Sequence, residues 1–196
     1  MSNLKTYLAV LSAVTLAAAL GLILSGIFTK PSGTTAVLGG PFTLTDYDGN
    51  DVDQDLLKGR PTAMFFGFTH CPEVCPTTVG NLEAWMSEIG TGAGQLQVLF
   101  VTVDPQRDTP AVLSDYLRAQ SDRVRGLTGT PDQIKAMLAA WRVYAKKVPL
   151  EGGDYTMDHS SMIYLIDPKG NYFGSIGYGE TDARALDALK RLIDAS

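Results

Sequence analysis

The pattern of apolar and polar residues divides the chain into one long apolar segment and a region of alternating strand and helix patterns. Residues 6–29 contain no charged residue, and about 22 residues of helix span about 33 Å, enough to cross a bilayer core. We therefore predict a transmembrane anchor over residues 1–30, a Gly-, Ser-, Thr- and Pro-rich linker over residues 31–40, and one folded domain over residues 41–196. The alternative is a signal peptide cleaved near residues 17–19, but the apolar part of such a peptide is usually only about 7–15 residues long.

Within the domain, a short apolar run over residues 64–68 predicts a central strand that is buried on both faces. Residues 41–45 alternate in polarity, and the turn at residues 48–50 returns the chain at Val52, which predicts a β-hairpin. Further strands are predicted at residues 97–103, 124–127, 161–167 and 172–176. Apolar residues at helical spacing predict helices over residues 76–88, from Pro110, over 131–144 and over 181–195, with Val112 on the inner face of the second. Residues 146–155 are predicted to be a polar, glycine-containing loop.

This order of elements predicts the fold class. Strands that alternate with helices and end in an antiparallel hairpin are typical of an α/β protein with a mixed sheet and helices on both faces. The only two cysteines, Cys71 and Cys75, lie at the first junction between a strand and a helix. A redox-type cysteine pair at this junction makes the predicted fold thioredoxin-like, preceded by the one N-terminal transmembrane helix.

Charge adds information about partners and location. The formal net charge is −5, and the chain has no Lys/Arg-rich run, so we expect no nucleic-acid partner. Lys5 and Lys30 flank the apolar segment almost symmetrically, which leaves the orientation weakly encoded. The leader lacks the Arg-rich amphipathic pattern of a mitochondrial presequence. We therefore expect a single-pass protein of the bacterial inner membrane, with the soluble domain in the periplasm.

The two cysteines are the main chemical signal in the domain. In open α/β sheets, ligands and reacting groups gather at the carboxyl ends of the strands. Pro76 fits the first turn of the following helix, and a helix N-terminus stabilises a thiolate. A disulfide between Cys71 and Cys75 would close too small a loop to add much stability. We therefore expect the pair to carry out metal or redox chemistry.

The spacing of the cysteines favours a metal, while a disulfide in a distorted loop remains the alternative. Residues at i and i+4 of a helix have Cβ atoms about 5–6 Å apart, whereas a relaxed disulfide needs about 3.5–4.5 Å. The chain has two histidines, His70 and His159. Neighbouring side chains at a strand end point to opposite faces, so His70 is a poor co-ligand of Cys71. His159 is the remaining candidate, and a hydrogen-bonded structural histidine is its alternative role.

Two thiolates and one imidazole form a soft, three-ligand set. Such a set suits Cu(I) and accepts Cu(II) with an added donor, while a Cys2His zinc site that also binds water is the alternative. Met157 and Asp158 adjoin His159 as candidate weak donors. If the segment is extended, only Met157 shares a face with His159.

Three segments resemble the Sco/SenC family: Phe-Gly-Phe-Thr-His-Cys-Pro-Glu-Val-Cys-Pro-Thr-Thr at residues 66–78, Val-Asp-Pro-Gln-Arg-Asp-Thr-Pro at residues 103–110, and Asp-His-Ser-Ser-Met-Ile-Tyr-Leu-Ile-Asp-Pro at residues 158–168. This resemblance covers residues 42–195 and implies a membrane-anchored, copper-handling protein of thioredoxin fold that assists assembly of cytochrome c oxidase. It also implies that the copper ligands are Cys71, Cys75 and His159.

The resemblance gives no settled role to the acidic and basic residues of the second segment. Asp104 and Arg107 follow a strand at the same edge of the sheet as the cysteines. We hypothesise that one of them tunes the site or docks a partner. The alternative is a salt-bridged turn and helix cap.

Together these observations predict a copper metallochaperone that binds one copper ion, as Cu(I) or Cu(II), and assists assembly of the CuA centre of cytochrome c oxidase. The expected partners are the copper-binding subunit II of the oxidase and other periplasmic copper chaperones or thiol oxidoreductases. The alternative is a thiol–disulfide oxidoreductase that reduces the cysteines of that oxidase subunit. In that case Cys71 and Cys75 are catalytic and His159 is dispensable. A peroxidase, which would need an isolated cysteine of low pKa, is the weakest of the three hypotheses.

Overall fold

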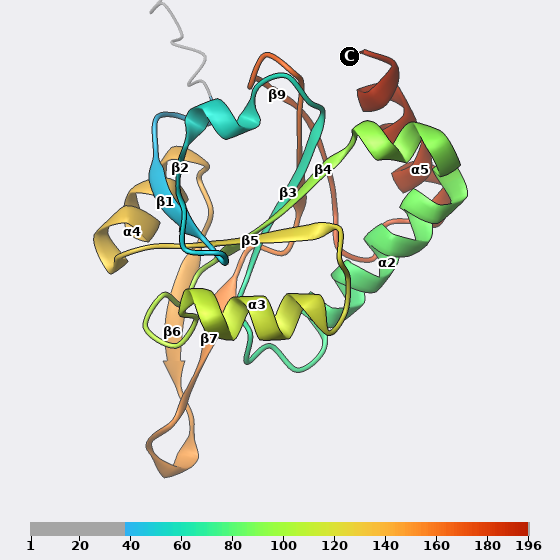
Figure 1. Cartoon of the computed structure of the whole chain (residues 1–196). Coiled ribbons are helices and arrows are strands. Elements are labelled where there is room, and N and C mark those ends of the chain that lie inside the picture. Colours follow the sequence, from blue (N-terminus) through green and yellow to red (C-terminus); the bar gives the residue numbers. More distant parts are fainter. Residues whose placement is uncertain (1–37, 196) are drawn as a thin grey trace, which may run out of the picture. The chain divides into compact units, whose positions relative to one another are not determined.

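The computed structural model describes residues 38–195 (Figure 1). The predicted anchor over residues 1–30 and most of the predicted linker lie outside this range. Across the described part of the chain, no helix combines the length and apolar character needed to cross a membrane.

The core of the domain is a seven-stranded mixed sheet in the order β2-β1-β5-β4-β3-β8-β9. The strands are β1 (Thr43–Asp46), β2 (Asp51–Asp53), β3 (Thr62–Gly67), β4 (Gln97–Thr102), β5 (Val124–Thr128), β8 (Ile163–Ile166) and β9 (Tyr172–Ile176). Strands β3, β4 and β5 are parallel, and β1 and β8 join them in antiparallel orientation. All six residues of β3 are buried, because β4 and β8 flank the strand and helices cover both of its faces. The predicted central strand and mixed sheet are confirmed.

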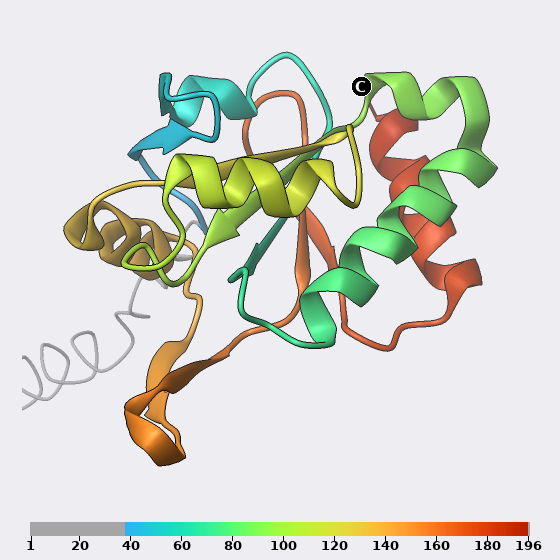
Figure 2. The same cartoon turned by 60° about the horizontal axis from the view of Figure 1, so that its bottom comes forward.

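Helices cover both faces of the sheet, as predicted. They are α2 (Val74–Ile89), α3 (Pro110–Arg118), α4 (Pro131–Ala140) and α5 (Asp182–Asp194), with short 3-10 turns at η1 (Gln54–Leu57), η2 (Gly90–Gln95) and η3 (Glu151–Gly153). Right-handed crossovers between adjacent parallel strands put α2 and α3 on one face. Both views show α5 beside α2 (Figures 1 and 2), and Trp85 of α2 donates a 2.9 Å hydrogen bond to Asp182 of α5.

Aromatic contacts identify the helix on the opposite face. Phe65 of β3 packs edge-on against Phe100, whose ring lies 6.2 Å from that of Tyr116 of α3. The next residue, Phe66, points the other way and packs against Tyr164 of β8. Trp141, at the C-terminus of α4, packs on the same Tyr164 ring with centroids 5.7 Å apart. The end of α4 therefore covers the face opposite α3.

Two helix boundaries and the place of one helical residue differ from the predictions. Helix α2 begins at Val74 rather than at Pro76, so Cys75 already belongs to its first turn. Helix α4 ends at Ala140 rather than near Tyr144, because the chain turns at Arg142 with a left-handed φ of 53°. Val112 is 38% exposed, so its predicted place on the inner face of α3 is wrong.

The largest local difference concerns residues 146–155, which we predicted to be an irregular loop. They form most of a second, two-stranded antiparallel sheet made of β6 (Ala145–Pro149) and β7 (Tyr155–His159). This β6–β7 hairpin projects from the body of the domain (Figure 2). Its register pairs Ala145 with His159, so the predicted ligand lies at the end of β7 next to the body of the domain.

The first described residues contact the domain. The backbone N–H of Gly39 donates a 2.9 Å hydrogen bond to the carbonyl of Ala140, and Leu38 packs against the core. A Cβ atom on Gly39 would lie 3.1 Å from the ring of Trp141. Residues 38–40, which fall in the predicted linker, therefore pack against the end of α4.

Candidate metal centre

Cys71 and Cys75 lie at the carboxyl end of β3, where the chain turns into α2. Neither is in a disulfide, and the backbone N–H of Cys75 donates to the Cys71 sulfur at 3.3 Å. This close packing depends on Gly67, the last residue of β3. A Cβ atom there would lie 2.7 Å from the Cys75 sulfur and 2.8 Å from the ring of Phe100. A glycine at this position therefore allows the first turn of α2 to lie directly against the strand.

The two sulfurs differ in charge. A hydrogen bond from the Cys75 thiol, assisted by His159 and the backbone N–H of Cys75, lowers the pKa of Cys71 to about 4, although burial opposes this shift. The same hydrogen bond, together with burial and repulsion from the Cys71 thiolate, raises the pKa of Cys75. The pair therefore consists of a thiolate at Cys71, which accepts a hydrogen bond, and a neutral thiol at Cys75, which donates it.

A pH titration of thiolate absorbance in the reduced, metal-free chain is expected to reveal this asymmetry. Because the pKa of Cys71 is about 4, one thiolate per chain should be present near neutral pH and should disappear as the pH falls through about 4. A Cys71→Ser variant should lose this signal, whereas a Cys75→Ser variant should keep a thiolate but titrate at higher pH. Finding no thiolate near neutral pH in the unmodified chain would contradict the asymmetry.

His159 reaches the cysteines from β7. Its Nδ1 atom lies 2.8 Å from the carbonyl oxygen of Ser160. A carbonyl only accepts hydrogen bonds, so Nδ1 carries a proton, and Nε2 is the nitrogen that can bind a metal when it is unprotonated. The ring packs edge-on against Phe68, with centroids 5.7 Å apart, and the side chain is close enough to the Cys71 sulfur to lower the pKa of that thiol.

The other candidate donors lie away from the sulfurs. His70 is exposed and its Nδ1 pairs with the hydroxyl of neighbouring Thr69 at 3.1 Å. Met157 lines a groove beside Ile134 and other residues of α4. Asp158 is exposed and lies near the hydroxyl of Tyr144.

The three predicted ligands are neighbours, but they do not form a complete metal-binding cluster. Among residues 38–195, no group of three or more His, Cys, Asp and Glu side chains has the arrangement of a metal-binding cluster. The contacts are pairwise instead, Cys71 with Cys75 and Cys71 with His159. The chemistry of the donors nevertheless fits a soft metal, since one thiolate, one thiol and one imidazole are neighbours at this end of the sheet.

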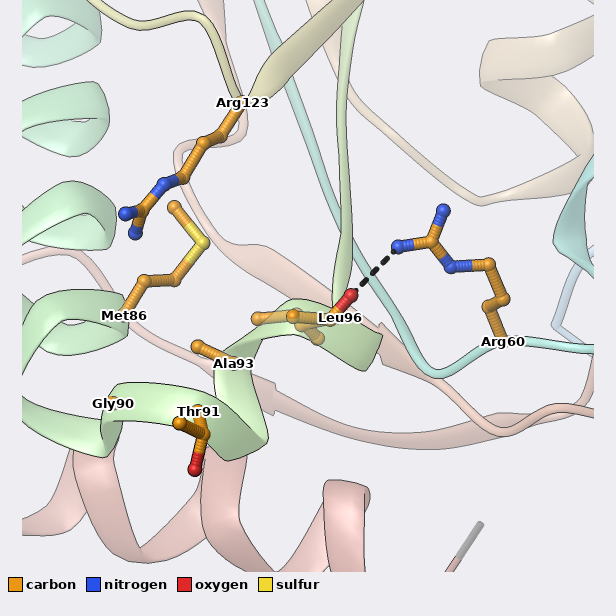
Figure 3. A pocket seen from close by; sticks show the side chains of 8 residues that line it. Arg60, Met86, Gly90, Thr91, Ala93, Leu96 and Arg123 are labelled. Atoms are coloured by element: carbon orange, nitrogen blue, oxygen red, sulfur yellow. Dashed lines mark hydrogen bonds between the residues drawn. The ribbon is translucent and has the colours of Figure 1, made fainter.

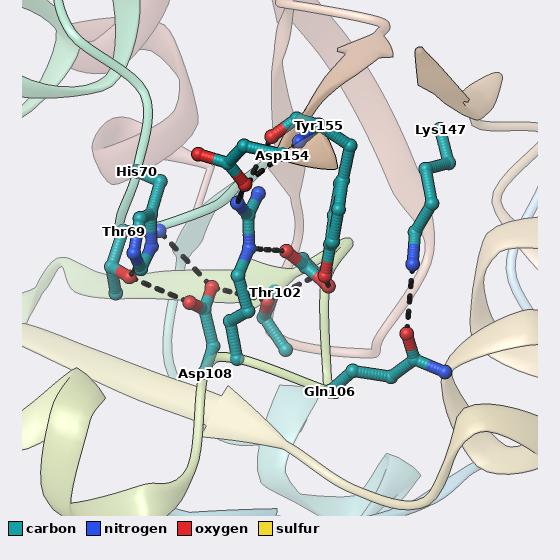
Figure 4. Close-up of polar contacts among 10 residues, drawn as sticks. Thr69, His70, Thr102, Gln106, Asp108, Lys147, Asp154 and Tyr155 are labelled. Atoms are coloured by element: carbon teal, nitrogen blue, oxygen red, sulfur yellow. Dashed lines mark hydrogen bonds and ion pairs between the residues drawn. The ribbon is translucent and has the colours of Figure 1, made fainter. Parts of the chain in front are cut away.

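A buried carboxylate that the sequence reasoning missed holds the cysteine loop in place. Asp108 is fully buried and accepts hydrogen bonds from the backbone N–H of Thr69 at 3.1 Å, from the Thr69 hydroxyl at 2.6 Å and from the Thr102 hydroxyl at 2.6 Å (Figure 4). Burial raises the pKa of Asp108. The residue lies in the 103–110 segment that resembles the family, but its burial could not be read from the sequence.

The hollow drawn in Figure 3 lies at the opposite end of the sheet from the cysteines. It has a volume of about 360 Å³, and its lining includes Arg60, Met86, Leu96 and Arg123. Arg60 and Leu96 come just before β3 and β4, whereas the cysteines follow β3. Arg60 donates to the carbonyls of Gly94 and Gln95. This hollow is therefore no part of the cysteine and histidine site.

The chain is similar in sequence to proteins from mitochondria and bacteria. The profile of the family described as SCO1/SenC matches residues 30–194. Protein SCO2, mitochondrial, of Saccharomyces cerevisiae is 38% identical over 164 residues, which are 82% of this chain and 54% of that protein. The SCO2-like protein of Rickettsia felis is 35% identical over 155 residues, 78% of this chain and 76% of that protein. The chain thus spans about half the length of the yeast relative.

Comparison with solved structures leads to the same family. The structure of Bradyrhizobium japonicum ScoI with copper bound has a TM-score of 0.73 and 44% identity, and the match covers 79% of this chain and 99% of that one. The structure of yeast Sco1 with copper bound has a TM-score of 0.74 and 36% identity, and covers 82% and 90%. These matches confirm the predicted thioredoxin-like mixed fold, and together with the profile match they show that the chain belongs to the SCO1/SenC family.

Proposed function

We propose that the chain is a copper carrier that holds one copper ion between Cys71, Cys75 and His159 and delivers it to the CuA centre on subunit II of cytochrome c oxidase. The observation that carries this proposal is the position of His159 beside the Cys71 thiolate. Its Nδ1 proton is engaged by Ser160, which leaves Nε2 available to a metal. The copper found in the solved relatives from Bradyrhizobium and yeast supports the same choice of metal.

The incomplete assembly of the ligands suits a carrier better than a permanent metal site. Three soft ligands are sufficient for Cu(I) and leave its coordination open to an incoming ligand. An acceptor ligand can then form a bond to copper as His159 or a cysteine releases one. Such an exchange moves the ion without oxidation or reduction, and the reduced cysteines remain ready for another ion.

The location and partners follow from the proposed function and from the sequence. We infer that residues 1–30 anchor the domain at the periplasmic face of a bacterial inner membrane, where oxidase subunit II and other copper chaperones or thiol oxidoreductases would be its partners. The similarity to a Rickettsia protein supports a bacterial setting.

Copper binding and transfer can be measured directly. The reduced chain should retain about one equivalent of Cu(I) against a competing chelator, and should pass it to the copper-free, reduced copper domain of an oxidase subunit II. After two equivalents of Cu(I) have been passed, one-electron oxidation with added ferricyanide should produce the mixed-valence spectrum of the CuA centre. A chain that retains no copper against even a weak competitor would overturn the proposal.

The alternative function is that of a thiol–disulfide oxidoreductase acting on the cysteines of the same oxidase subunit. The unequal sulfurs suit the chemistry of thiol–disulfide exchange, since an ionised cysteine beside a buried, protonated one resembles a nucleophile with its resolving partner. A structure of similar fold, 24% identical to this chain, is described as revealing a disulfide switch in BsSco, a Sco-family member. This function predicts reduction of the subunit's disulfide in the absence of copper, and it predicts that a His159→Ala variant keeps this activity.

A further inference from the structure

The 104–108 loop, which follows β4, lies between the two segments that carry the proposed copper ligands (Figure 4). Two adjacent residues of this loop bind one segment each. Asp108 accepts hydrogen bonds from Thr69, two residues before Cys71. Arg107 binds Tyr155, the first residue of β7, which ends at His159. One short loop therefore connects both halves of the site.

Arg107 is held in a closed set of polar contacts. Its Nε donates to a carboxylate oxygen of Asp104 at 2.5 Å, and its Nη1 donates to the carbonyl of Tyr155 at 3.0 Å. The hydroxyl of Tyr155 donates to the other oxygen of Asp104 at 2.9 Å. The same Nη1 also lies 3.3 Å from Asp154 at the tip of the hairpin. Because the arginine side chain is only 17% exposed, these charge-assisted contacts are expected to be stronger than ordinary surface ion pairs.

Aromatic rings extend this set of contacts to His159. The guanidinium of Arg107 lies 3.8 Å from the ring centroid of Tyr155 and 5.9 Å from that of Phe68. Phe68 is the residue whose ring packs edge-on against His159. The Nη2 atom of Arg107 is buried and has no hydrogen-bond partner among the described residues, and the adjacent aromatic faces partly compensate for that loss. Arg107 thus contacts both the start of β7 and the ring that packs against its last residue.

The β6–β7 hairpin needs such an anchor. It forms its own two-stranded sheet, separate from the seven-stranded one, and none of the residues in its two strands is fully buried. A two-stranded hairpin by itself is marginally stable in water. Its other polar contact with the 104–108 loop, between Lys147 and Gln106 at 2.9 Å, is exposed. Ala145 and Met157 pack against the core, whereas the start of β7 is held by the contacts of Tyr155 with Arg107 and Asp104.

We propose that Arg107 is a positioning residue of the copper site, which sets the position of His159 relative to the two sulfurs by fixing β7 against the loop that also holds Cys71. This inference rests on the proposed copper-binding function. It assigns Arg107 an indirect role, because its own side chain contacts Phe68 and Tyr155 rather than the ligands.

The test uses Arg107→Met and Arg107→Lys in the full chain. Arg107→Met should lower copper affinity about 10–100-fold, the usual effect of losing an outer-shell partner, and should weaken the imidazole nitrogen signal in the EPR spectrum of the Cu(II) form. Arg107→Lys keeps the charge but not the planar guanidinium group, so the copper affinity of this variant should lie between those of the unmodified chain and Arg107→Met. Arg191→Met is the matched control, because the exposed Arg191 side chain forms its one ion pair among residues 38–195 with Asp187 of the same helix. The copper affinity of this variant should be unchanged.

A double-mutant cycle with His159→Ala separates positioning from a general effect on folding. If Arg107 acts through His159, Arg107→Met should cause no further loss of affinity in the His159→Ala background. In the metal-free chain, Arg107→Met should also speed amide hydrogen exchange across β6 and β7 while leaving β3 and β4 unchanged. Tyr155→Phe removes only the hydroxyl bound to Asp104, and should change exchange and affinity in the same direction but less.

Two results would overturn this inference alone: copper bound through His159 with unchanged affinity and spectrum in Arg107→Met, or a loss that is the same with and without His159. Failure of the unmodified chain to retain any copper would instead overturn the proposed function, and this inference with it. The hydrogen-exchange measurement does not depend on copper, and uniform protection of the hairpin in Arg107→Met would show that Arg107 does not anchor β7.

Discussion

Replacement of His159 by alanine is expected to lower the copper affinity of the reduced chain by more than about 100-fold. Loss of an outer-shell partner of a metal ligand already costs about 10–100-fold, and this change removes the ligand itself. The remaining donors, Cys71 and Cys75, lie together at the start of α2 and leave copper two-coordinate. Competition with a chelator of known affinity, under anaerobic reducing conditions, measures the effect.

The chain supplies its own control for this experiment. His70 is its only other histidine, and it is exposed and paired with Thr69 rather than turned to the sulfurs. A His70→Ala variant should therefore bind copper as tightly as the unmodified chain. Tight, unaltered binding by His159→Ala would refute the ligand assignment, and a large loss in His70→Ala would show that the wrong histidine has been assigned.

The reduction potential of the Cys71–Cys75 pair is expected to be less negative than the about −270 mV of thioredoxin. A thiolate that is stabilised in the reduced form makes the corresponding disulfide a stronger oxidant, as in DsbA at about −120 mV. Here the hydrogen bond from Cys75, followed by His159, stabilises the Cys71 thiolate. Cys75 is protonated near neutral pH with or without its shift, so the shift of Cys71 decides the direction.

The pH dependence of this potential provides a second measurement. Between the pKa of Cys71, about 4, and the raised pKa of Cys75, reduction of the disulfide takes up two electrons and one proton, giving one thiolate and one thiol. As the pH rises, the reduction potential should then become more negative by about 30 mV per pH unit, which is half the slope of a couple that takes up two protons. Equilibration with glutathione and dithiothreitol buffers over this pH range gives both quantities.

The potential also distinguishes the two functions. A protein that keeps a partner's cysteines reduced needs a strongly negative potential, whereas a carrier needs a dithiol that stays reduced until copper arrives. A measured value at or below that of thioredoxin would contradict the thiolate argument and would favour the reductase. A less negative value would favour the copper carrier, because the reduced, metal-binding form would then be the stable one.

The sequence alone identified the parts of the molecule whose patterns are local. The apolar run at residues 64–68 predicted β3, because a strand buried on both faces has no polar alternation. The helix predicted from residue 131 does begin there, where Thr130 and Gln133 form a capping box, a signal that is local in sequence. The three family-like segments predicted the fold and the family, and they named Cys71, Cys75 and His159 before any distance was known.

Only the tertiary structure revealed the β6–β7 hairpin and the residues that anchor it. The strands of the hairpin are largely polar and contain no fully buried residue, so their sequence lacks the period that marks a half-buried strand. Their position instead depends on contacts between distant residues, such as Tyr155 with Asp104, 51 positions away. The start of α2 at Val74 could not be predicted from the sequence either, because the N-cap residue Glu73 makes no side-chain capping hydrogen bond.

The sequence therefore determined which side chains are available for copper, since residue type fixes the donor atoms. The fold decided which of them meet, because the chain must bring β7 back to the end of β3 and hold it there. Arg107 contacts β7 and Asp108 contacts Thr69; the adjacency of the two residues is visible in the sequence, but these separate contacts are not. Such contacts follow from packing over long sequence separations, which no local pattern encodes.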